Sequence, residues 1–329
     1  HSVCFPLLLP QWMKNLIFFL KEEEKETTAS LIRGVLAKLH KAGYPVAGFD
    51  MYVTSTVLPG SGLSSSAACE VLIGTTGNHL FCQDKFDAVE IAKIGQAAEN
   101  EYFGKPCGLM DQTASSVGDA VAIDFKDPAN PIVRSINADL TGLGLALCII
   151  DCGADHAALT NEYASIPEEM SKVAAHFGKK VLREVKEEDL LADLAQVRKE
   201  AGDRAVLRAL HFYADDRRAA EEADALERKD KEAFLNLVKE SGRSSWELLQ
   251  NITPAAAITH QDMAVALAVA EKALNGKGAC RVHGGGFAGT IQAFVPVEDV
   301  CEFKKTMETM LSEGCCHVLS IRPAGGLIL

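Results

Sequence analysis

Residues 51–80 read MYVTSTVLPGSGLSSSAACEVLIGTTGNHL, and the rest of the chain is organised around them. Met51–Leu58 is rich in β-branched and aromatic residues, which favours a β-strand. A proline, two glycines and a run of serines follow, and Ala67–Leu80 is an apolar stretch that predicts a helix. A strand that leads through such a loop into a helix can bind phosphate, because the first N–H groups of a helix have no intrahelical partner and carry partial positive charge.

This Gly/Ser loop differs from the two common nucleotide-binding loops. A Walker A loop ends in Gly-Lys-Ser/Thr, and this loop contains no lysine. A dinucleotide-binding loop reads G-x-G-x-x-G, and Ser65 stands in place of its third glycine. The alternative interpretation is a tight turn with a serine N-cap. The glycines favour phosphate binding over that alternative, because they let the backbone approach an anion closely.

The composition is that of a globular protein long enough for two domains. The chain has 329 residues, of which 48% are hydrophobic and 24% are charged. Its net charge of −12 argues against nucleic acid and anionic membranes as main partners. An acidic protein can still bind ATP, because a nucleotide site uses local backbone N–H groups and a metal ion.

The cysteines and the beginning of the chain indicate a cellular compartment. The 10 cysteines include no C-x-x-C pair, which predicts reduced, mostly buried thiols in a cytosolic protein and neither a disulfide framework nor a zinc site. The apolar stretch Val3–Leu9 is short and lacks a basic leader. We therefore predict neither a signal peptide nor a transmembrane helix.

Helices and strands are predicted along most of the chain. Thr27–Ala42 reads as an amphipathic helix with Leu31, Val35, Leu36 and Leu39 on one face. Further helices are predicted at residues 85–101, 161–198, 203–251, 260–274 and 300–311, and strands at residues 117–125, 132–136, 144–151, 278–283, 290–295 and 317–322. The final strands and helix predict an α+β half whose sheet packs under helices.

Three separated stretches resemble one family. Leu58–Ala68 (LPGSGLSSSAA) is similar to the central phosphate loop of the GHMP kinases, and Arg281–Thr290 (RVHGGGFAGT) to a Gly-rich loop near their C-terminus. Between them, Glu99–Gln112 (ENEYFGKPCGLMDQ) closely resembles the galactokinase segment that ends in Cys-Gly-Ile-Met-Asp-Gln. Glycine-rich loops alone would be a weak signal, but three motifs in the family's order identify the chain as a member from about Thr27 onward.

The resemblance implies an α/β (α+β) protein with the two-domain GHMP kinase fold. Residues 27–143 would form the N-terminal, ATP-binding domain, truncated at its start. Residues 144–329 would form a ferredoxin-like C-terminal domain, with the active site between the two. Residues 1–26 do not resemble the family and are not assigned to a domain.

The resemblance also implies residues for phosphate and metal. The ATP phosphates would be bound by Gly60, Ser61, Gly62, Leu63, Ser64, Ser65, Ser66 and Ala67. Ser65 and Glu99 would hold Mg²⁺, a hard cation that prefers oxygen ligands. Ser64 and Ser66 compete with Ser65 for the serine role.

A further set of residues would act on the sugar. Asp111 matches the family's catalytic aspartate, which would accept the proton of the anomeric hydroxyl or orient that hydroxyl for in-line attack on the γ-phosphate. Gly108 and Tyr163 match contacts to the sugar. Gly284, Gly285 and Gly286 would close over the active site.

Each of these residues has an alternative structural role. A loop aspartate such as Asp111 is most often a helix N-cap, and Glu99 could be a solvated helix residue. Tyr163 could be a core aromatic with its hydroxyl at the surface, and Gly284–Gly286 could form only a hairpin turn. The 9 histidines show no ligand spacing, which predicts structural or surface roles.

The function implied is ATP-dependent phosphorylation of galactose at its anomeric hydroxyl, which gives galactose 1-phosphate in galactose metabolism. ATP would be the co-substrate and Mg²⁺ the cofactor of a cytoplasmic monomer that binds small molecules and neither nucleic acid nor membrane. Three alternatives stay open: a kinase for another sugar such as N-acetylgalactosamine, an inactive ATP- and galactose-binding fragment, and a sensor that regulates transcription. The intact Asp111 and serine run argue against the sensor.

The beginning of the chain departs from the family. Galactokinases open with a motif that reads roughly Gly-Arg-x-Asn-Leu-Ile-Gly-Glu-His-Thr-Asp, and nothing like it is present here. That motif supplies an arginine near the transferred phosphate and contacts to galactose, so we expect severely reduced phosphoryl transfer without it. A milder difference around Ser241–Ser245 and Leu248–Pro254 leaves the identity of the sugar open.

Overall fold

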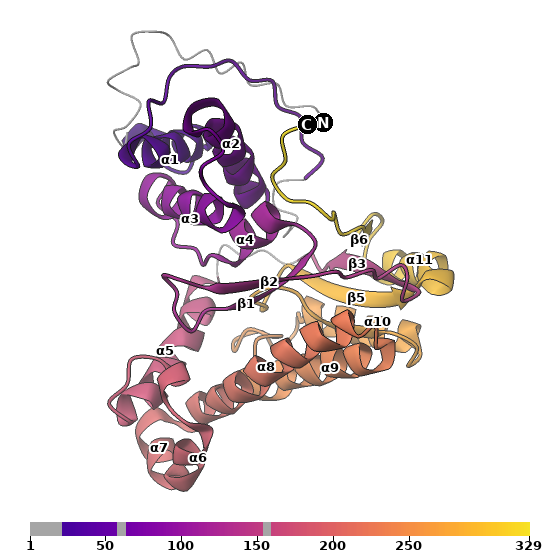
Figure 1. Ribbon diagram of the computed structural model, residues 1–329. Coiled ribbons are helices and arrows are strands. Elements are labelled where there is room, and N and C mark those ends of the chain that lie inside the picture. The colour runs from indigo at the N-terminus through magenta and orange to yellow at the C-terminus, as the bar shows by residue number, and fades with distance from the viewer. Residues whose placement is uncertain (1–21, 58–63, 154–158) are drawn as a thin grey trace. The chain divides into compact units, whose positions relative to one another are not determined.

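The computed structural model describes residues 22–57, 64–153 and 159–329, which form two compact units (Figure 1). Unit 1 consists of the described residues up to Asn137 together with Ile321–Leu329. Unit 2 is Ala138–Ser320, so the chain passes from one unit to the other twice. The assignment of residues 27–143 and 144–329 to two family domains stays a prediction.

Unit 1 is mainly helical. A short 3-10 turn (Glu22–Glu24) precedes the helices, which are α1 (Thr28–Lys41), α2 (Ser65–Cys82), α3 (Ala88–Ala98), the π-helical turn η3 (Glu99–Phe103) and α4 (Met110–Val117). An antiparallel hairpin follows, in which β1 (Ala120–Asp124) pairs with β2 (Ile132–Ile136). The predicted helices at residues 27–42 and 67–80 and both strands of the hairpin are confirmed.

The amphipathic face of α1 forms part of the core of unit 1. Leu31, Val35, Leu36 and Leu39 are at most 4% exposed, as the periodicity predicts. On the same helix, a Cβ at Gly34 would lie 2.7 Å from the Cβ of Ala98, so α1 and α3 approach closely only because this residue has no side chain. A capping box between Asp87 and Glu90 starts α3.

The prediction of a strand at Met51–Leu58 is wrong. Residues 51–57 belong to no strand, and Leu58 lies outside the described residues. Exposure alternates at the start of the segment, where Met51 and Val53 are half-buried and Tyr52 is exposed. The composition of the stretch therefore suits a strand but does not provide pairing, because a strand also needs a neighbour for its backbone groups. In the described chain, β1 and β2 pair only with each other.

The last segment of the chain covers the C-terminal end of α4. The Asp119 N–H donates to the main-chain oxygen of Arg322 at 2.7 Å, and the Gly326 N–H donates to that of Ser116 at 3.2 Å. A Cβ at Gly325 would lie 1.9 Å from the Ser116 oxygen, so no larger residue fits there. Residues 321–329 thus belong to unit 1 by direct backbone contact.

Unit 2 is built on a four-stranded antiparallel sheet in the order β4-β5-β3-β6. The strands are β3 (Leu145–Asp151), β4 (Ala279–Val282), β5 (Thr290–Pro296) and β6 (Cys316–Leu319). Helix α10 (Asp262–Leu274) precedes β4, and the turn η6 (Val297–Asp299) and α11 (Val300–Met310) lie between β5 and β6. Both helices and one face of the sheet share a core that includes Ile150, Ile291, Leu267 and Met307. Two strand-helix-strand units interleaved in this strand order are the ferredoxin-like arrangement.

The remaining helices of unit 2 have a second core. They are α5 (Thr160–His176), η4 (Leu182–Glu184), α6 (Glu187–Ala192), α7 (Leu194–Ala201), α8 (Asp203–Glu227), α9 (Lys231–Ser244) and the π-helical turn η5 (Ser245–Leu249). Val173, Leu190, Val197 and Val206 are buried in this core. The long helices α8 and α9 pack side by side (Figure 1).

Two findings concern the whole described chain. Its nine cysteines are all free thiols, as the sequence predicts. Among the described residues, no helix is both long and apolar enough to span a bilayer.

A histidine joins α5 to α7. His176 Nδ1 lies 2.7 Å from Glu200 Oε2, and its Nε2 lies 2.8 Å from Asp193 Oδ2. Hydrogen bonds to Glu200 and Asp193 raise the pKa of His176, and the bond to His176 lowers the pKa of Glu200. Both ring nitrogens donate only in the imidazolium form, so both contacts need a charged histidine.

We expect His176→Gln to lose more stability at about pH 6 than at about pH 9. Because the folded-state pKa of His176 is raised, its stabilising effect is fully present below the unfolded pKa and disappears as pH rises through the folded one. Thermal unfolding at the two pH values gives the difference in melting temperature between the variant and the parent chain. The exposed His260 offers a control, since His260→Gln should show the same difference at both pH values. The same difference at both pH values for His176→Gln would contradict the prediction.

Candidate active site

The end of the Gly/Ser loop lies against the predicted catalytic aspartate. Ser64 occupies the N-cap position of α2, and its backbone is left-handed, with φ 54° and ψ 54°. Its hydroxyl does not cap the helix but donates to Asp111 Oδ2 at 2.7 Å. Asp111 is exposed in the first turn of α4, a helix that the sequence did not predict. The structure thus joins two predicted site residues that are 47 positions apart.

The rest of the predicted phosphate loop is only partly described. Gly60, Ser61, Gly62 and Leu63 lie outside the described residues. Ser65, Ser66 and Ala67 form the first turn of α2. Their N–H groups are those that have no acceptor inside a helix, so this helix start can bind an anion.

A buried polar cluster lies behind this surface. The side-chain amide of Gln112 donates from Nε2 to Glu70 Oε2 at 3.0 Å and to Glu99 Oε2 at 2.9 Å. All three residues are at most 3% exposed, although they come from three separate segments: α2, η3 and α4. The predicted metal ligand Glu99 is therefore held in place by the residue that follows Asp111.

The electrostatics of this cluster favour a protonated, neutral Glu70 near pH 7. Burial raises the pKa of the Glu70 carboxyl to about 8; the Gln112 bond opposes this rise, and nearby Glu99 and Asp111 add to it. Glu70 Oε1 and Gln112 Oε1 are buried and have no hydrogen-bond partner among the described residues. The ammonium of Lys105 lies 4.0 Å from Glu99 Oε1 and is the cation nearest to that oxygen among the described ion pairs.

These residues suit magnesium by their chemistry. Carboxylate and hydroxyl oxygens are the donors that Mg²⁺ prefers, and Glu99 and Ser65 supply both kinds. Within the described residues, no group of three side chains forms a complete metal site. Mg²⁺ often takes only one or two protein ligands and completes its shell with phosphates and water.

The predicted sugar-contact loop at Gly108 is fixed by its neighbours. The Cys107 N–H donates to Asn100 Oδ1 at 2.7 Å, and Gln96 Nε2 donates to the main-chain oxygen of Cys107 at 3.2 Å. Gly108 itself is exposed, and a Cβ there would meet nothing within 4 Å. The structure therefore leaves open space beside Gly108.

In unit 2, Tyr163 and the Gly-rich loop (residues 284–289) lie together. The Tyr163 hydroxyl donates to the main-chain oxygen of Gly286 at 2.7 Å, and its ring meets that of Phe287 edge-on at 5.6 Å. Burial raises the pKa of Tyr163. The structure thus gives Tyr163 a contact to the loop that the sequence did not predict.

Asn251 holds the same loop from a second segment. Its Nδ2 donates to the main-chain oxygen of Gly285 at 3.1 Å, and its own main-chain oxygen accepts the Phe287 N–H at 2.5 Å. Asn251 is only 2% exposed. Gly286 has φ +83°, and a Cβ there would lie 2.1 Å from the Asn251 oxygen, so glycine is required at this position.

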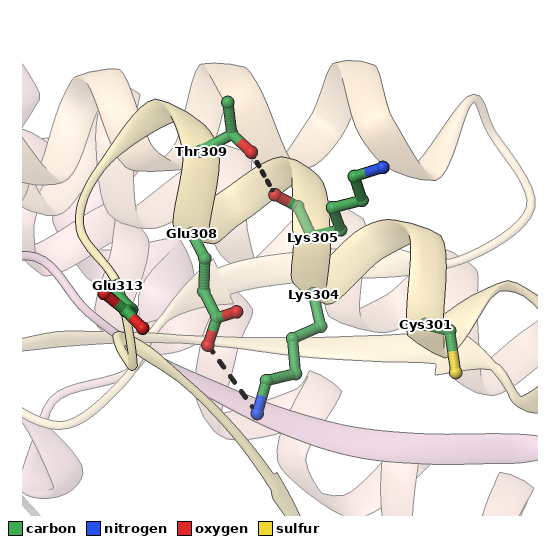
Figure 2. A pocket seen from close by; sticks show the side chains of 6 residues that line it. All are labelled: Cys301, Lys304, Lys305, Glu308, Thr309 and Glu313. Atoms are coloured by element: carbon green, nitrogen blue, oxygen red, sulfur yellow. Dashed lines mark hydrogen bonds and ion pairs between the residues drawn. The ribbon is translucent and has the colours of Figure 1, made fainter.

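A pocket elsewhere in unit 2 does not contain these residues. Figure 2 shows that it is lined by Cys301, Lys304, Lys305, Glu308, Thr309 and Glu313 of α11 and the residues after it. Two interactions join its lining residues: Lys304 Nζ lies 3.6 Å from Glu308 Oε1, and Thr309 Oγ1 donates to the main-chain oxygen of Lys305 at 2.7 Å. No predicted site residue lines this pocket, so we do not assign the reaction to it.

Comparison with known proteins gives the family. The model of the "GHMP kinases N terminal domain" matches residues 30–119, which carry Ser64, Glu99 and Asp111. A galactokinase of Streptomyces coelicolor is 33% identical over 275 residues, which are 84% of this chain and 68% of that protein. The chain belongs to the galactokinase family of GHMP kinases. A galactokinase of Glaesserella parasuis is 32% identical over 298 residues, 88% of this chain and 73% of the relative.

A solved structure of the galactokinase family supports the fold. Lactococcus lactis galactokinase, determined in complex with galactose, superposes with a TM-score of 0.73. The superposition covers 95% of this chain and 78% of that one, at 22% sequence identity. The chain therefore has the GHMP kinase fold, and it is a sugar kinase by family.

Sequence reasoning missed two residues of the buried cluster in unit 1, Glu70 and Gln112, and one residue of unit 2 that holds the Gly-rich loop, Asn251. Glu70 did carry a signal, because it is the only charged residue of the apolar stretch Ala67–Leu80 apart from His79. A lone carboxylate on a buried helix face has to find a partner. Asn251 carried no such signal, because its contacts depend on where distant segments meet.

Proposed function

We propose that this chain transfers the γ-phosphate of ATP to the anomeric hydroxyl of galactose. The observation that carries the proposal is the 2.7 Å hydrogen bond from Ser64 to Asp111, which joins a helix start suited to phosphate with a carboxylate suited to a hydroxyl. The galactokinase relatives supply the choice of galactose among sugars. In this proposal ATP binds to residues 27–143, which the sequence analysis assigns to the ATP-binding domain. The enzyme works in the cytoplasm.

Phosphoryl transfer needs little more than positioning and charge stabilisation. The N–H groups at the start of α2 and the loop before it bind the phosphates, where the positive end of the helix lies. Asp111 accepts the proton of the attacking hydroxyl or orients that hydroxyl, and Ser64 holds the carboxylate in place. Gly108 leaves room for the sugar beside it.

Mg²⁺ is the cofactor in this proposal, and Glu99 with Ser65 would hold it. When bound, it neutralises the charge on the phosphates during transfer. Gln112 keeps the Glu99 carboxylate oriented, and Lys105 remains near its second oxygen. The buried Gln112 Oε1 has no hydrogen-bond partner among the described residues, and this supports a cation nearby because a buried acceptor without a partner costs stability.

Tyr163 makes its sugar contact through a hydroxyl that is already placed. The hydroxyl donates to the Gly286 oxygen, and a phenolic oxygen can accept a second bond while it donates one. The Gly-rich loop would contribute main-chain groups to the phosphate or sugar. These roles follow the family pattern and are proposals for this chain.

The experiment that tests the function is ADP release from Mg-ATP with galactose, with N-acetylgalactosamine and without sugar. We expect release only with galactose, and phosphorus NMR of the product should give an anomeric phosphate. Release that does not depend on a sugar, or that occurs only with N-acetylgalactosamine, would overturn the choice of galactose. Absence of release with every sugar would favour an inactive binding protein, which ATP would still stabilise against heat.

Glu99→Gln is expected to raise the Mg²⁺ concentration for half-maximal activity by about tenfold or more, because a ligand charge is lost. The amide can keep an oxygen toward Gln112, so the fold should survive. Glu101→Gln is the matched control, because Glu101 is an exposed carboxylate two residues along that pairs with Lys38. An equal shift in both variants would argue against Glu99 as a metal ligand.

A further inference from the structure

Arg208 of α8 is a fully buried cation, with 0% of its side chain exposed. Its Nε donates to the main-chain oxygen of Leu249 at 3.1 Å. Its Nη1 donates to Ser165 Oγ at 2.9 Å and to Glu169 Oε2 at 3.0 Å. One guanidinium therefore bonds both to α5, which supplies Ser165 and Glu169, and to the end of η5, which supplies Leu249.

The two segments that Arg208 bridges are those that hold the Gly-rich loop. Tyr163 lies two residues before Ser165 on α5 and donates its hydroxyl to the loop. Asn251 lies two residues after Leu249 and bonds to the loop through both its side chain and its main chain. Tyr163 and Asn251, which bond to the loop, thus each lie two residues from a residue that accepts a hydrogen bond from Arg208.

The chemistry of the position calls for arginine. A guanidinium presents its N–H groups in a fixed planar fork and can reach two segments at once, whereas an ammonium is a point charge. Burial lowers the pKa of Arg208, and the charge of Glu169 opposes this. Its Nη2 is buried without a hydrogen-bond partner among the described residues, which costs stability that an apolar side chain would not lose.

We infer that Arg208 is a positioning residue for the Gly-rich loop. By fixing Ser165 and Leu249, it sets the places of Tyr163 and Asn251, and these hold the loop. The inference deepens the proposed function and rests on it for its effect on catalysis. The position of the loop can, however, be measured without any activity.

Hydrogen–deuterium exchange of the full chain tests the inference. Arg208→Lys keeps the charge but loses the fork, and Ser165→Ala removes only one bridge. We expect the loop amides, above all that of Phe287, to exchange about tenfold faster in Arg208→Lys, while exchange in α10 stays unchanged. Ser165→Ala should give a smaller change in the same amides, and it decides the question if Arg208→Lys does not fold.

Arg204, one turn earlier on α8, provides the matched control. It forms a bidentate pair with the same Glu169, at 3.1 Å from Nε to Oε2 and 2.5 Å from Nη2 to Oε1. Within the described part of the chain, its hydrogen bonds go to Glu169 alone. Arg204→Lys should therefore leave loop exchange unchanged. Faster loop exchange in both arginine variants, or in neither Arg208→Lys nor Ser165→Ala, would overturn the inference.

Steady-state kinetics adds a second readout. A displaced loop should raise the KM for ATP or for galactose about tenfold in Arg208→Lys and leave it unchanged in Arg204→Lys. A lower apparent kcat at unchanged KM would indicate only less folded enzyme and would overturn the positioning role. If the parent chain has no kinase activity, the proposed function fails, and the exchange experiment still decides the role of Arg208.

Discussion

Replacing Asp111 with asparagine is expected to lower kcat by about 100-fold or more, because an amide cannot accept the proton of the attacking hydroxyl. Asparagine keeps an oxygen that can accept the Ser64 hydroxyl bond, so the local structure should persist. Asp111 is exposed, and its replacement should leave the melting temperature almost unchanged. Galactose-dependent ADP release, with thermal unfolding in parallel, measures both effects.

Ser64→Ala is the control for this prediction. It removes the donor and leaves the carboxylate, so we expect a loss of about tenfold, which reflects orientation alone. If Asp111→Asn kept about half of the parent activity, Asp111 would not be the proton acceptor, and its role would be limited to orienting the hydroxyl. If Ser64→Ala lost as much activity as Asp111→Asn, the orientation of the carboxylate by Ser64 would be as important as its charge.

Replacing Gly286 with alanine is expected to destabilise unit 2 by about 3 kcal/mol, because backbone strain and overpacking add. The residue has φ +83°, and the new Cβ would lie 2.1 Å from the Asn251 oxygen, which is a main-chain atom that cannot rotate away. The Tyr163 bond to the Gly286 oxygen would be disturbed as well. Chemical denaturation followed by circular dichroism measures the loss, and activity should fall with it.

Gly284→Ala separates the two causes. Gly284 also has a positive φ, +68°, but a Cβ there would meet nothing within 4 Å. Only backbone strain then remains, and we expect a loss of about 1 kcal/mol. If the two alanine variants were equally stable, the close approach of Gly286 to Asn251 would not be important for stability.

The helices and the unit 2 sheet could be predicted because their signals are local. The apolar spacing of Leu31, Val35 and Leu39 predicts one buried face, and all three residues are buried. Met51–Leu58 had the composition of a strand, but whether a strand pairs depends on which other segments reach it. Helix α4 was missed because Met110–Val117 is short and largely polar, so its periodicity is weak.

Those residues of the candidate site that belong to a recognisable sequence motif could be predicted. Those that only the fold brings together could not. Ser64 was predicted near phosphate, but its left-handed backbone and its bond to Asp111 are tertiary features. The roles of Gln112, Asn251 and Arg208 could not be predicted, because each of them bonds to segments distant in sequence. The sugar contact of Tyr163 stays a prediction, and its bond to Gly286 is a contact that spacing does not indicate.

The double passage of the chain between the units has a consequence for its synthesis. The segment that covers the end of α4 belongs to unit 1 but is translated only after the whole of unit 2. On the ribosome, unit 1 therefore cannot complete its own packing first, although domains usually fold in the order in which they emerge. The contacts that cover the helix carrying Asp111 therefore form last. A nascent chain that stops anywhere within unit 2 would leave the end of that helix uncovered.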